Sequence, residues 1–568
     1  MAAASALLKR IELPRGSRWI NEDVRPVGSE RRTWTFLTFH NFWLLINCNI
    51  ATYLTGSALI PLGLTWWQAI IAIIIGNIIA TVALILSSLA GAYYHIGLSG
   101  AYGAPNSSSG TASFLHLSGQ YTRSISLMFT HNTRYGFQSW VGGECTYLML
   151  LSWDPNLEKH IPNKIPADTG MTSAQFLSYF VFCMISLPFL WIRPHRIEKF
   201  FYFASTVTLI FFLVLLIWAL ATMGPDGFGD TLKSGTDIPL TGSPNSTVWL
   251  MISGIMSTVG SIAAGILNQN DYARLSRRPS DAIWGQAFAF PFYSIIASVI
   301  GILVTAATQK RMGEAIWNPP TLFVGLLAKD NDAGTRAAVF FAGLALAISQ
   351  LGSNLPGNAL SGGMDLASTF PKYINIRRGA YIVALLSPVV NPWRLVNTAT
   401  TFLTVLSGYG VFLAPMTGLM VAHYIMVAKM KVNVDDLYTG DSNSIYWYYK
   451  GLNWRAPIAW VVGVAPLLPG FIAAVNLSIS ISDGAIELYY LNYMYGFMAS
   501  AFVYALLHRL VPDQKLDAFV QESPSAKEVQ ALYDGRWDIT YAEAGTQIED
   551  SPPPADPRKG AASVTTSV

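Results

Sequence analysis

The sequence predicts an all-α integral membrane protein with about twelve transmembrane helices. Three observations support this fold class: 52% of the 568 residues are hydrophobic, only 12% are charged, and long apolar segments recur along the chain. Soluble domains carry roughly a quarter charged residues. The 46 glycines and 30 prolines also fit helices packed in lipid, where both residues are more frequent than in soluble helices.

A helix needs ~20 mostly apolar residues to cross a bilayer. Eleven segments meet this requirement, at 36–60, 66–92, 174–193, 199–222, 247–268, 282–307, 336–358, 379–393, 398–427, 455–476 and 484–509. A twelfth span is expected near 124–150, because it keeps the basic loops on one side of the membrane. Only its second half, Tyr135–Leu151, is convincingly apolar.

Four short basic loops set the expected orientation. They are Arg193–Lys199, Arg274–Arg278, Lys372–Arg378 and Lys429–Lys431. Because cytoplasmic loops carry the excess of Lys and Arg, twelve spans place all four loops and both termini in the cytoplasm.

We therefore expect three regions in a protein of the plasma membrane. Residues 1–35 form a cytoplasmic tail, residues 36–510 form the transmembrane domain, and residues 511–568 form a disordered cytoplasmic tail that contains the proline-rich stretch Ser551–Pro554. Trafficking or endocytic factors are the expected partners of the two tails, and the lipid bilayer is the partner of the domain.

Several classes of protein are disfavoured. A net charge of +3 is too small to indicate nucleic acid as a partner. The three cysteines lie in or beside apolar segments without a CxxC pair, which argues against a disulfide framework and a zinc site. No HExxH or GxSxG motif lies at a membrane face, so we expect neither an enzyme, nor a cofactor, nor a metal centre.

Two polar interruptions inside apolar segments are candidates for a binding site. The stretch Gly352–Asn358 is predicted to break a helix, and it carries Asn354 and Asn358 one helical turn apart. The apolar segment 247–268 ends in the four polar residues Asn268–Asp271. Discontinuous helices of this kind form sites for a polar solute and a cation in the middle of the membrane.

Three further polar residues lie within predicted spans. Asn49 lies in the first span, and Gln138 and Glu144 lie in the third. Each amide can contact a ligand or serve as a hydrogen-bonding link between helices. An intramembrane carboxylate such as Glu144 is a candidate for proton coupling, although it can also pair with a neighbouring helix.

Six motifs carry a resemblance to a known family. They are Leu62–Ala69, Gly91–Gly97, Tyr135–Gly143, Leu267–Arg274, Phe370–Gly379 and Leu406–Pro415. In these motifs the chain resembles the fungal branch of the nucleobase:cation symporter-1 family, the uracil/allantoin permease-like (Fur-type) group. The resemblance extends from about Asn21 to Leu510.

The resemblance implies a LeuT-like fold, with two inverted five-helix repeats, broken spans 1 and 6, and two additional helices. It implies proton-driven import of a nucleobase or related heterocycle, such as uracil, allantoin or uric acid, by alternating access. The alternative within the family is a thiamine or nicotinamide riboside transporter. Gln138, Asn358 and Asn49 correspond to the family's substrate-binding positions, and Asn354 is the further candidate.

The family also implies where a coupling cation would bind. The corresponding neighbourhood between spans 1 and 8 is Leu45, Cys48, Ser349, Gly352 and Ser353. Because only Ser349 and Ser353 carry a hydroxyl group there, sodium coupling is disfavoured and the proton is the expected ion.

The chain departs from the family at the positions that stack the substrate. The family places a tryptophan in span 3, four residues before the glutamine, and another in span 6. Here these positions are Arg134 and Ile262. An arginine does not replace a stacking indole, and its charge is costly in a dry pocket.

The departure extends over Ser99–Arg134, which is rich in Ser, Gly, Thr and His. In a shifted reading frame the codons of Ser99–Ala112 permit the Arg, Trp-Gly and Asn-Arg pattern of the family. Our hypothesis is a frameshift or a misplaced intron boundary over about 99–134, with a divergent loop as the alternative. If the segment is translated as written, the product can be incapable of transport.

Overall fold

The computed structural model describes most of the predicted transmembrane domain. The described residues are 12–13, 23, 25–97, 113–192, 194–224, 227–228, 246–437, 443–448 and 453–522. The first fourteen residues of the segment questioned above, from Ser99 to Ala112, lie outside them, and so do most of both predicted tails.

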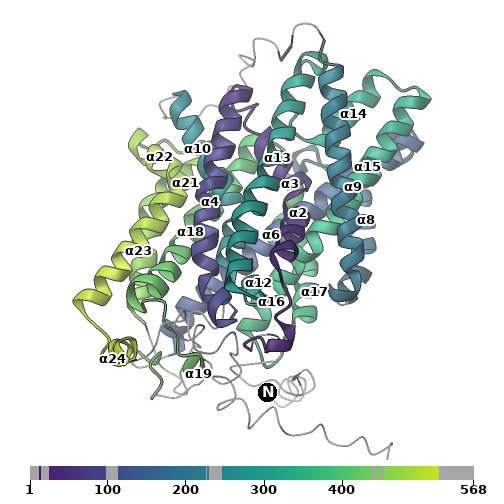
Figure 1. Cartoon of the computed structure of the whole chain (residues 1–568). Helices are drawn as coiled ribbons and strands as arrows, with labels where there is room; N and C mark the ends of the chain where they lie inside the picture. The colour runs from purple at the N-terminus through teal and green to yellow at the C-terminus, as the bar shows by residue number, and fades with distance from the viewer. Residues whose placement is uncertain are drawn as a thin grey trace, which may run out of the picture.

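The described residues form a helical bundle (Figure 1). Eight transmembrane positions are filled by α4 (Trp66–Tyr94), α6 (Ser113–Trp153), α8 (Ser173–Trp191), α9 (Pro194–Ala221), α13 (Pro279–Met312), α17 (Ile376–Leu386), α18 (Ala399–Val421) with the π-helical turn η6 (Ala422–Val427), and α23 (Asn492–Leu510). Four further positions are filled by pairs of helices. The pairs α2 (Phe36–Asn47) with α3 (Ile50–Ser57) and α10 (Thr247–Ser261) with α11 (Ala263–Leu267) are separated by non-helical residues, whereas α15 (Ala333–Asn354) with α16 (Ser361–Thr369) and α20 (Arg455–Val464) with α21 (Leu468–Val475) are joined by a π-helical and a 3₁₀ turn, respectively.

Shorter helices connect these positions. They are α7 (Leu157–His160), α12 (Asn270–Ala273), α14 (Pro319–Lys329), α19 (Val434–Leu437), α22 (Asp483–Tyr490) and α24 (Gln514–Glu522), together with the 3₁₀ turns η1 (Ser29–Arg31), η2 (Ala167–Thr169), η4 (Ser387–Val390), η5 (Pro392–Arg394) and η7 (Ala465–Leu467). The described residues contain no strand, only an isolated β-bridge between Trp34 and Ser276.

Seven of the described helices are individually long and apolar enough to cross a membrane, or eight if the bent pair α23 and α24 is included. Among the other expected spans, α2/α3 and α10/α11 are divided into shorter helices, α17 is extended by the 3₁₀ turn η4, and α6 is one long helix that carries many polar residues. The fold therefore agrees with the predicted all-α membrane protein, and the twelve predicted positions all correspond to helices.

The third span is a continuous helix. Apolar continuity was predicted only for Tyr135–Leu151, but α6 runs without interruption over 41 residues, from Ser113 to Trp153. The residues around its midpoint, Thr130–Thr133, are buried. The span is thus complete as a helix in the chain as written, and polar side chains occupy its centre.

The first span breaks where the sequence places asparagine. The α2 helix ends at Asn47, and the side chain of Asn49 accepts a hydrogen bond from the backbone N–H of Thr52 at 2.9 Å, which caps α3. An asparagine competes with the helical backbone in this way because its side chain satisfies the N–H groups of a new first turn. Asn47 donates to the carbonyl of Phe290 at 3.0 Å, and this bond ties the end of α2 to α13.

The predicted break at Gly352–Asn358 is wrong in its form. Instead of ending, the helix widens into the π-helical turn η3 (Leu355–Leu360) and continues as α16. Pro356 has no backbone N–H and therefore cannot make the regular helical bond, so one wider turn accommodates it. The π-helical turn keeps Asn354 and Asn358 close together on one continuous span.

The C-terminal region also differs from expectation where it is described. Disorder was predicted from residue 511, but α24 forms a helix of nine residues there. Lys431 donates to the carbonyl of Val520 at 2.6 Å, which attaches α24 to the loop after η6. In Figure 1 the elements next to three of the basic loops, α12, α16 and α19, lie at the same lower end as α24, whereas α14 lies at the upper end.

Candidate functional site

Two cavities meet at the centre of the bundle. The upper one, of about 680 Å³, is lined by residues of α3, α6, α13 and α18, and the lower one, of about 510 Å³, by residues of α2, α6, α11, η3 and α16. We call the junction of the two cavities the central site; the residues that line both are Ile46, Asn49, Arg134, Gln138 and Ile262.

The central site lies where the first and sixth spans are interrupted. Asn49 stands in the gap between α2 and α3, and Ile262 stands in the gap between α10 and α11 with a non-helical φ of −111°. The α6 helix contributes Arg134 and Gln138, which are one helical turn apart and share a face. Interrupted helices that meet a continuous one in this manner expose backbone and amide groups to a solute.

Three of the four candidate substrate residues form one hydrogen-bonded chain. Asn354 donates from Nδ2 to the carbonyl of Tyr135 at 3.1 Å and to Oγ of Ser139 at 3.0 Å. Asn358 donates from Nδ2 to Oδ1 of Asn354 at 2.8 Å and to Oε1 of Gln138 at 2.9 Å. The chain connects the π-helical turn of span 8 to the middle of α6.

The orientation of these amides follows from their partners. The carbonyl of Tyr135 can only accept, so Asn354 must present its nitrogen to α6 and its oxygen to Asn358. Asn358 then donates in both directions, and Gln138 accepts with its oxygen. Within the described residues, Nε2 of Gln138 and Oδ1 of Asn358 have no hydrogen-bond partner.

The side-chain amide of Asn49 forms its hydrogen bonds at the break between α2 and α3. Its oxygen accepts from Thr52, and its Nδ2 donates to the carbonyl of Ile46. It nevertheless lines both cavities. Asn49 therefore lies at the central site, and its amide stabilises the break between the two helices.

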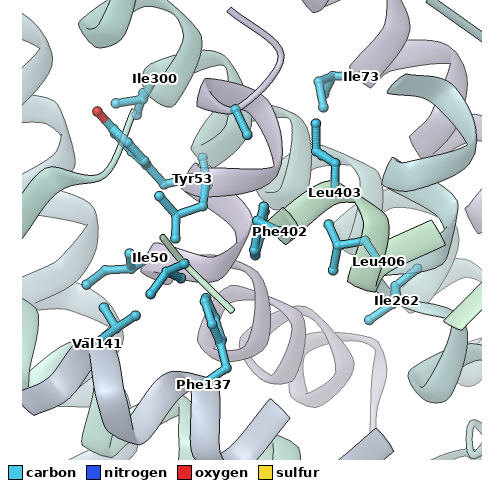
Figure 2. Packing of buried hydrophobic residues seen from close by; sticks show 14 of the residues in the cluster. Ile50, Tyr53, Ile73, Phe137, Val141, Ile262, Ile300, Phe402, Leu403 and Leu406 are labelled. Atoms are coloured by element: carbon cyan, nitrogen blue, oxygen red, sulfur yellow. The ribbon is translucent and has the colours of Figure 1, made fainter. Parts of the chain in front are cut away.

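Aromatic side chains form the walls of both cavities. Phe137 and Phe402 line the upper cavity with their ring centroids 5.5 Å apart, and Trp317, which does not line the cavity, packs against Phe402 at 5.5 Å. Figure 2 shows Phe402 between Phe137 and Leu406, with Ile262 beyond Leu406. Because these contacts join α6 and α18, which are distant in sequence, the sequence alone did not single them out.

The lower cavity has its own aromatic wall. Phe42 of α2 packs against Tyr272 of α12 with ring centroids 4.6 Å apart, and Phe42 also contacts Trp43 at 5.2 Å. Planar side chains thus line both of the cavities that meet at the central site. Such a site suits a flat ring.

The two positions where the family carries tryptophan both lie at the central site. Arg134 and Ile262 each line the upper and the lower cavity. The described part of the chain thus provides a guanidinium group and an aliphatic side chain where the family implies two indoles.

A buried polar cluster lies beside the lower cavity, and the sequence did not reveal it. Nε2 of His131 lies 3.1 Å from Oδ2 of Asp365, and Asn268 donates from Nδ2 to both oxygens of Asp365 at 3.1–3.2 Å. His131 belongs to α6, Asp365 to α16, and Asn268 to the end of α11. The cluster joins three separate spans, so it could be found only from the fold.

The candidate coupling residues occupy other places. Glu144 accepts from Nδ2 of Asn318 at 3.1 Å, which ties α6 to the start of α14, and it lines neither cavity. Ser353 donates to the carbonyl of Ser349 at 2.9 Å. The hydroxyl of Ser349 is buried without a hydrogen-bond partner in the described residues. Ser353 lines the lower cavity.

The fold agrees with that of a solved transporter. The chain is similar to Mhp1, a nucleobase-cation-symport-1 family transporter, in a closed conformation with bromovinylhydantoin bound: the TM-score is 0.65 at 18% identity, over 90% of this chain and 99% of that one. The similarity to the inward-facing conformation of Mhp1 gives a TM-score of 0.62 at 20% identity, over 90% and 100% of the two chains. The two broken spans therefore belong to a LeuT-like transporter fold.

Curated relatives cover nearly the same residues. The chain is 33% identical to the allantoin permease of Saccharomyces cerevisiae and 34% identical to its uracil permease, each over 87% of this chain and 76% of the relative. It is 31% identical to the transporter aclS of Aspergillus oryzae over 87% of both chains. A family model described as permease for cytosine/purines, uracil, thiamine, allantoin matches residues 26–496. The chain is thus a multi-pass membrane transporter, not an enzyme, and it belongs to this permease family.

Proposed function

We propose that the chain imports a planar nitrogen heterocycle with an N–H and a C=O group on one edge, such as a nucleobase, allantoin or uric acid. The observation that carries the proposal is a pair of adjacent unpartnered groups, one on Gln138 at the central site and one on Asn358, which lines the lower cavity. Nε2 of Gln138 offers a donor and Oδ1 of Asn358 offers an acceptor. A cyclic amide or ureide presents the complementary acceptor and donor side by side.

Transport then proceeds by alternating access between the two cavities. The substrate enters the upper cavity, stacks between the aromatic walls, and bonds to Gln138 and Asn358 at the central site. It leaves through the lower cavity when the helices on that side move apart. Interrupted helices at the centre permit this rocking motion because the site stays fixed while the bundle moves.

The proton is the proposed coupling ion. The pair of His131 and Asp365 is buried beside the lower cavity, and ionisable groups within spans mark proton pathways in transporters. Glu144 is a further candidate, although its bond to Asn318 serves equally well as a link between helices.

One observation favours sodium as a second candidate ion. The buried hydroxyl of Ser349 lacks a hydrogen-bond partner in the described residues, and a cation at this position would satisfy it. Leu45 and Cys48 add no side-chain oxygen to the same neighbourhood.

We place the protein in the plasma membrane with both tails in the cytoplasm. The support is that the elements next to three of the basic loops, α12, α16 and α19, lie at one end of the bundle (Figure 1), together with the excess of Lys and Arg that cytoplasmic loops carry. Trafficking factors are the proposed partners of the tails.

Uptake of radiolabelled uracil, allantoin, uric acid and thiamine into a permease-deficient yeast tests the proposal. We expect saturable uptake of at least one heterocycle, and we expect a protonophore to abolish it while removal of sodium leaves it unchanged. Gln138→Ala should raise the KM about tenfold, the effect of ~1.4 kcal/mol of lost hydrogen bonding. The matched control is Gln514→Ala, because Gln514 is exposed on α24.

The same assay separates the alternatives. Uptake of thiamine alone would assign the chain to the thiamine type of the family. Absence of all uptake, with the protein at the cell surface, would contradict the proposal and support a product that is incapable of transport.

A further inference from the structure

Arg134 places a positive charge at the centre of the transport path. It lines both cavities together with Gln138, which follows one helical turn later on the same face of α6. Arg134 therefore lines the junction through which a solute would move between the upper and the lower cavity. None of the hydrogen bonds that hold the amide chain of Asn354, Asn358 and Gln138 involves it.

No acidic side chain compensates this charge among the described residues. The intramembrane carboxylates have other partners: Asp365 pairs with His131 and Asn268, and Glu144 accepts from Asn318. Arg134 itself forms no ion pair or hydrogen bond within the described part of the chain. A charge in the middle of a membrane protein is costly unless it is paired. A bound anion would supply the counter-charge that the described side chains do not provide.

The side chains around Arg134 offer a planar anion aromatic surfaces and hydrogen-bond donors. Tyr409 lines the upper cavity and Tyr272 the lower one, so aromatic rings with hydroxyl groups flank the path on both sides of Arg134. A guanidinium group carries five N–H donors in a planar fork that matches two acceptor atoms at once. The N–H donors of Arg134 and Nε2 of Gln138 together outnumber the single free acceptor, Oδ1 of Asn358.

We propose that Arg134 makes the chain selective for anionic heterocycles, in which a ring carboxylate or an ionised ring imide binds the guanidinium. The inference rests on the proposed function and narrows its substrate class. Uric acid is an anion at neutral pH, whereas uracil and allantoin are neutral. Thiamine carries a positive charge, so Arg134 repels it. The residue that replaces the stacking tryptophan therefore acts as a selectivity determinant.

The test compares an anionic with a neutral substrate in the full-length chain. Uptake of radiolabelled uric acid and of uracil is measured in permease-deficient yeast, with unlabelled orotate, allantoin and thiamine as competitors. We expect a lower KM for uric acid than for uracil, and we expect orotate to compete more strongly than allantoin or thiamine.

Three variants make the assignment specific. Arg134→Gln should raise the KM for uric acid about tenfold or more, because it removes the charge from a charge-assisted hydrogen bond, and it should leave the KM for uracil unchanged or lower it. Arg134→Lys keeps the charge and should retain the preference for the anion. Arg509→Gln, at an exposed position at the end of α23, is the matched control for loss of a positive charge.

The outcomes test the selectivity assigned to Arg134 separately from the proposed transport function. Saturable uptake of uracil with no preference for uric acid, or an equal effect of Arg134→Gln on both substrates, would overturn the selectivity and leave the proposed function standing. Absence of uptake of every heterocycle, with the protein at the surface, would overturn both.

Discussion

Replacement of Asn354 by alanine tests how the site is preorganised. Asn354 contacts neither cavity, yet it fixes Asn358 and, through it, Gln138. Asn354→Ala removes two donated bonds of 3.0–3.1 Å to α6 and the acceptor that Asn358 uses. Once this acceptor is lost, Asn358 and Gln138 are free to turn their amides, and the donor and acceptor no longer face the substrate in one fixed order.

The expected size of the effect follows from the bonds that are lost. Hydrogen bonds between membrane helices contribute ~0.6 kcal/mol on average, and neutral bonds in proteins contribute about 1 kcal/mol. Two donated bonds therefore correspond to about 1.2–2 kcal/mol, or roughly an eightfold to thirtyfold rise in the KM. Ser139→Ala removes one of these bonds and leaves the carbonyl of Tyr135 in place, so it should cause a smaller rise.

A double-mutant cycle on uptake kinetics provides the assay. The KM of the preferred heterocycle is measured for Asn354→Ala, Gln138→Ala and the double variant, at equal surface abundance. If Asn354 acts by orienting Gln138, its replacement has little further effect once Gln138 is absent. Fully additive effects would refute this reasoning, because they would mean that the two amides act independently.

Three further changes test packing and coupling. Gly143→Val should lower the surface abundance and thermal stability, because a Cβ at Gly143 would lie 2.6 Å from a backbone atom of α8, whereas Gly484→Ala, with nothing within 4 Å, should be neutral in the same measurement. The single variant Asp365→Ala should have a lower melting temperature, measured on the purified protein, than the double variant Asp365→Ala/His131→Ala, because the single variant leaves the buried His131 without its carboxylate partner. Equal melting temperatures of the two variants would contradict this. Ser349→Ala should leave uptake unchanged under proton coupling, and loss of sodium-dependent uptake in this variant would favour sodium instead.

Much of the fold could be predicted from the sequence because lipid restricts the options. Long apolar segments must become helices in a bilayer, where each backbone polar group has to be satisfied within its own segment. The positions of α4, α8, α9 and α13 follow directly from this rule. The same rule made Gln138 and Asn358 conspicuous, because polar amides within apolar segments require a partner.

The remaining features depend on contacts between distant segments. The cluster of His131, Asp365 and Asn268 joins three spans, and no local pattern indicates which of many polar residues meet. Pro356 was expected to break its helix, whereas neighbouring helices allow a π-helical turn. Apolar continuity also failed as a guide to α6, since the polar centre of this helix is buried against other helices rather than exposed to lipid.

The central claim is that Gln138 and Asn358 hold the substrate beside Arg134 at the junction of the two cavities. A structure of the full-length chain determined with the transported heterocycle bound tests it most directly. We expect density for one planar ring at the central site, with its N–H and C=O edge within hydrogen-bond distance of Oδ1 of Asn358 and Nε2 of Gln138. Density for the transported substrate at any site that contacts neither amide would contradict the account.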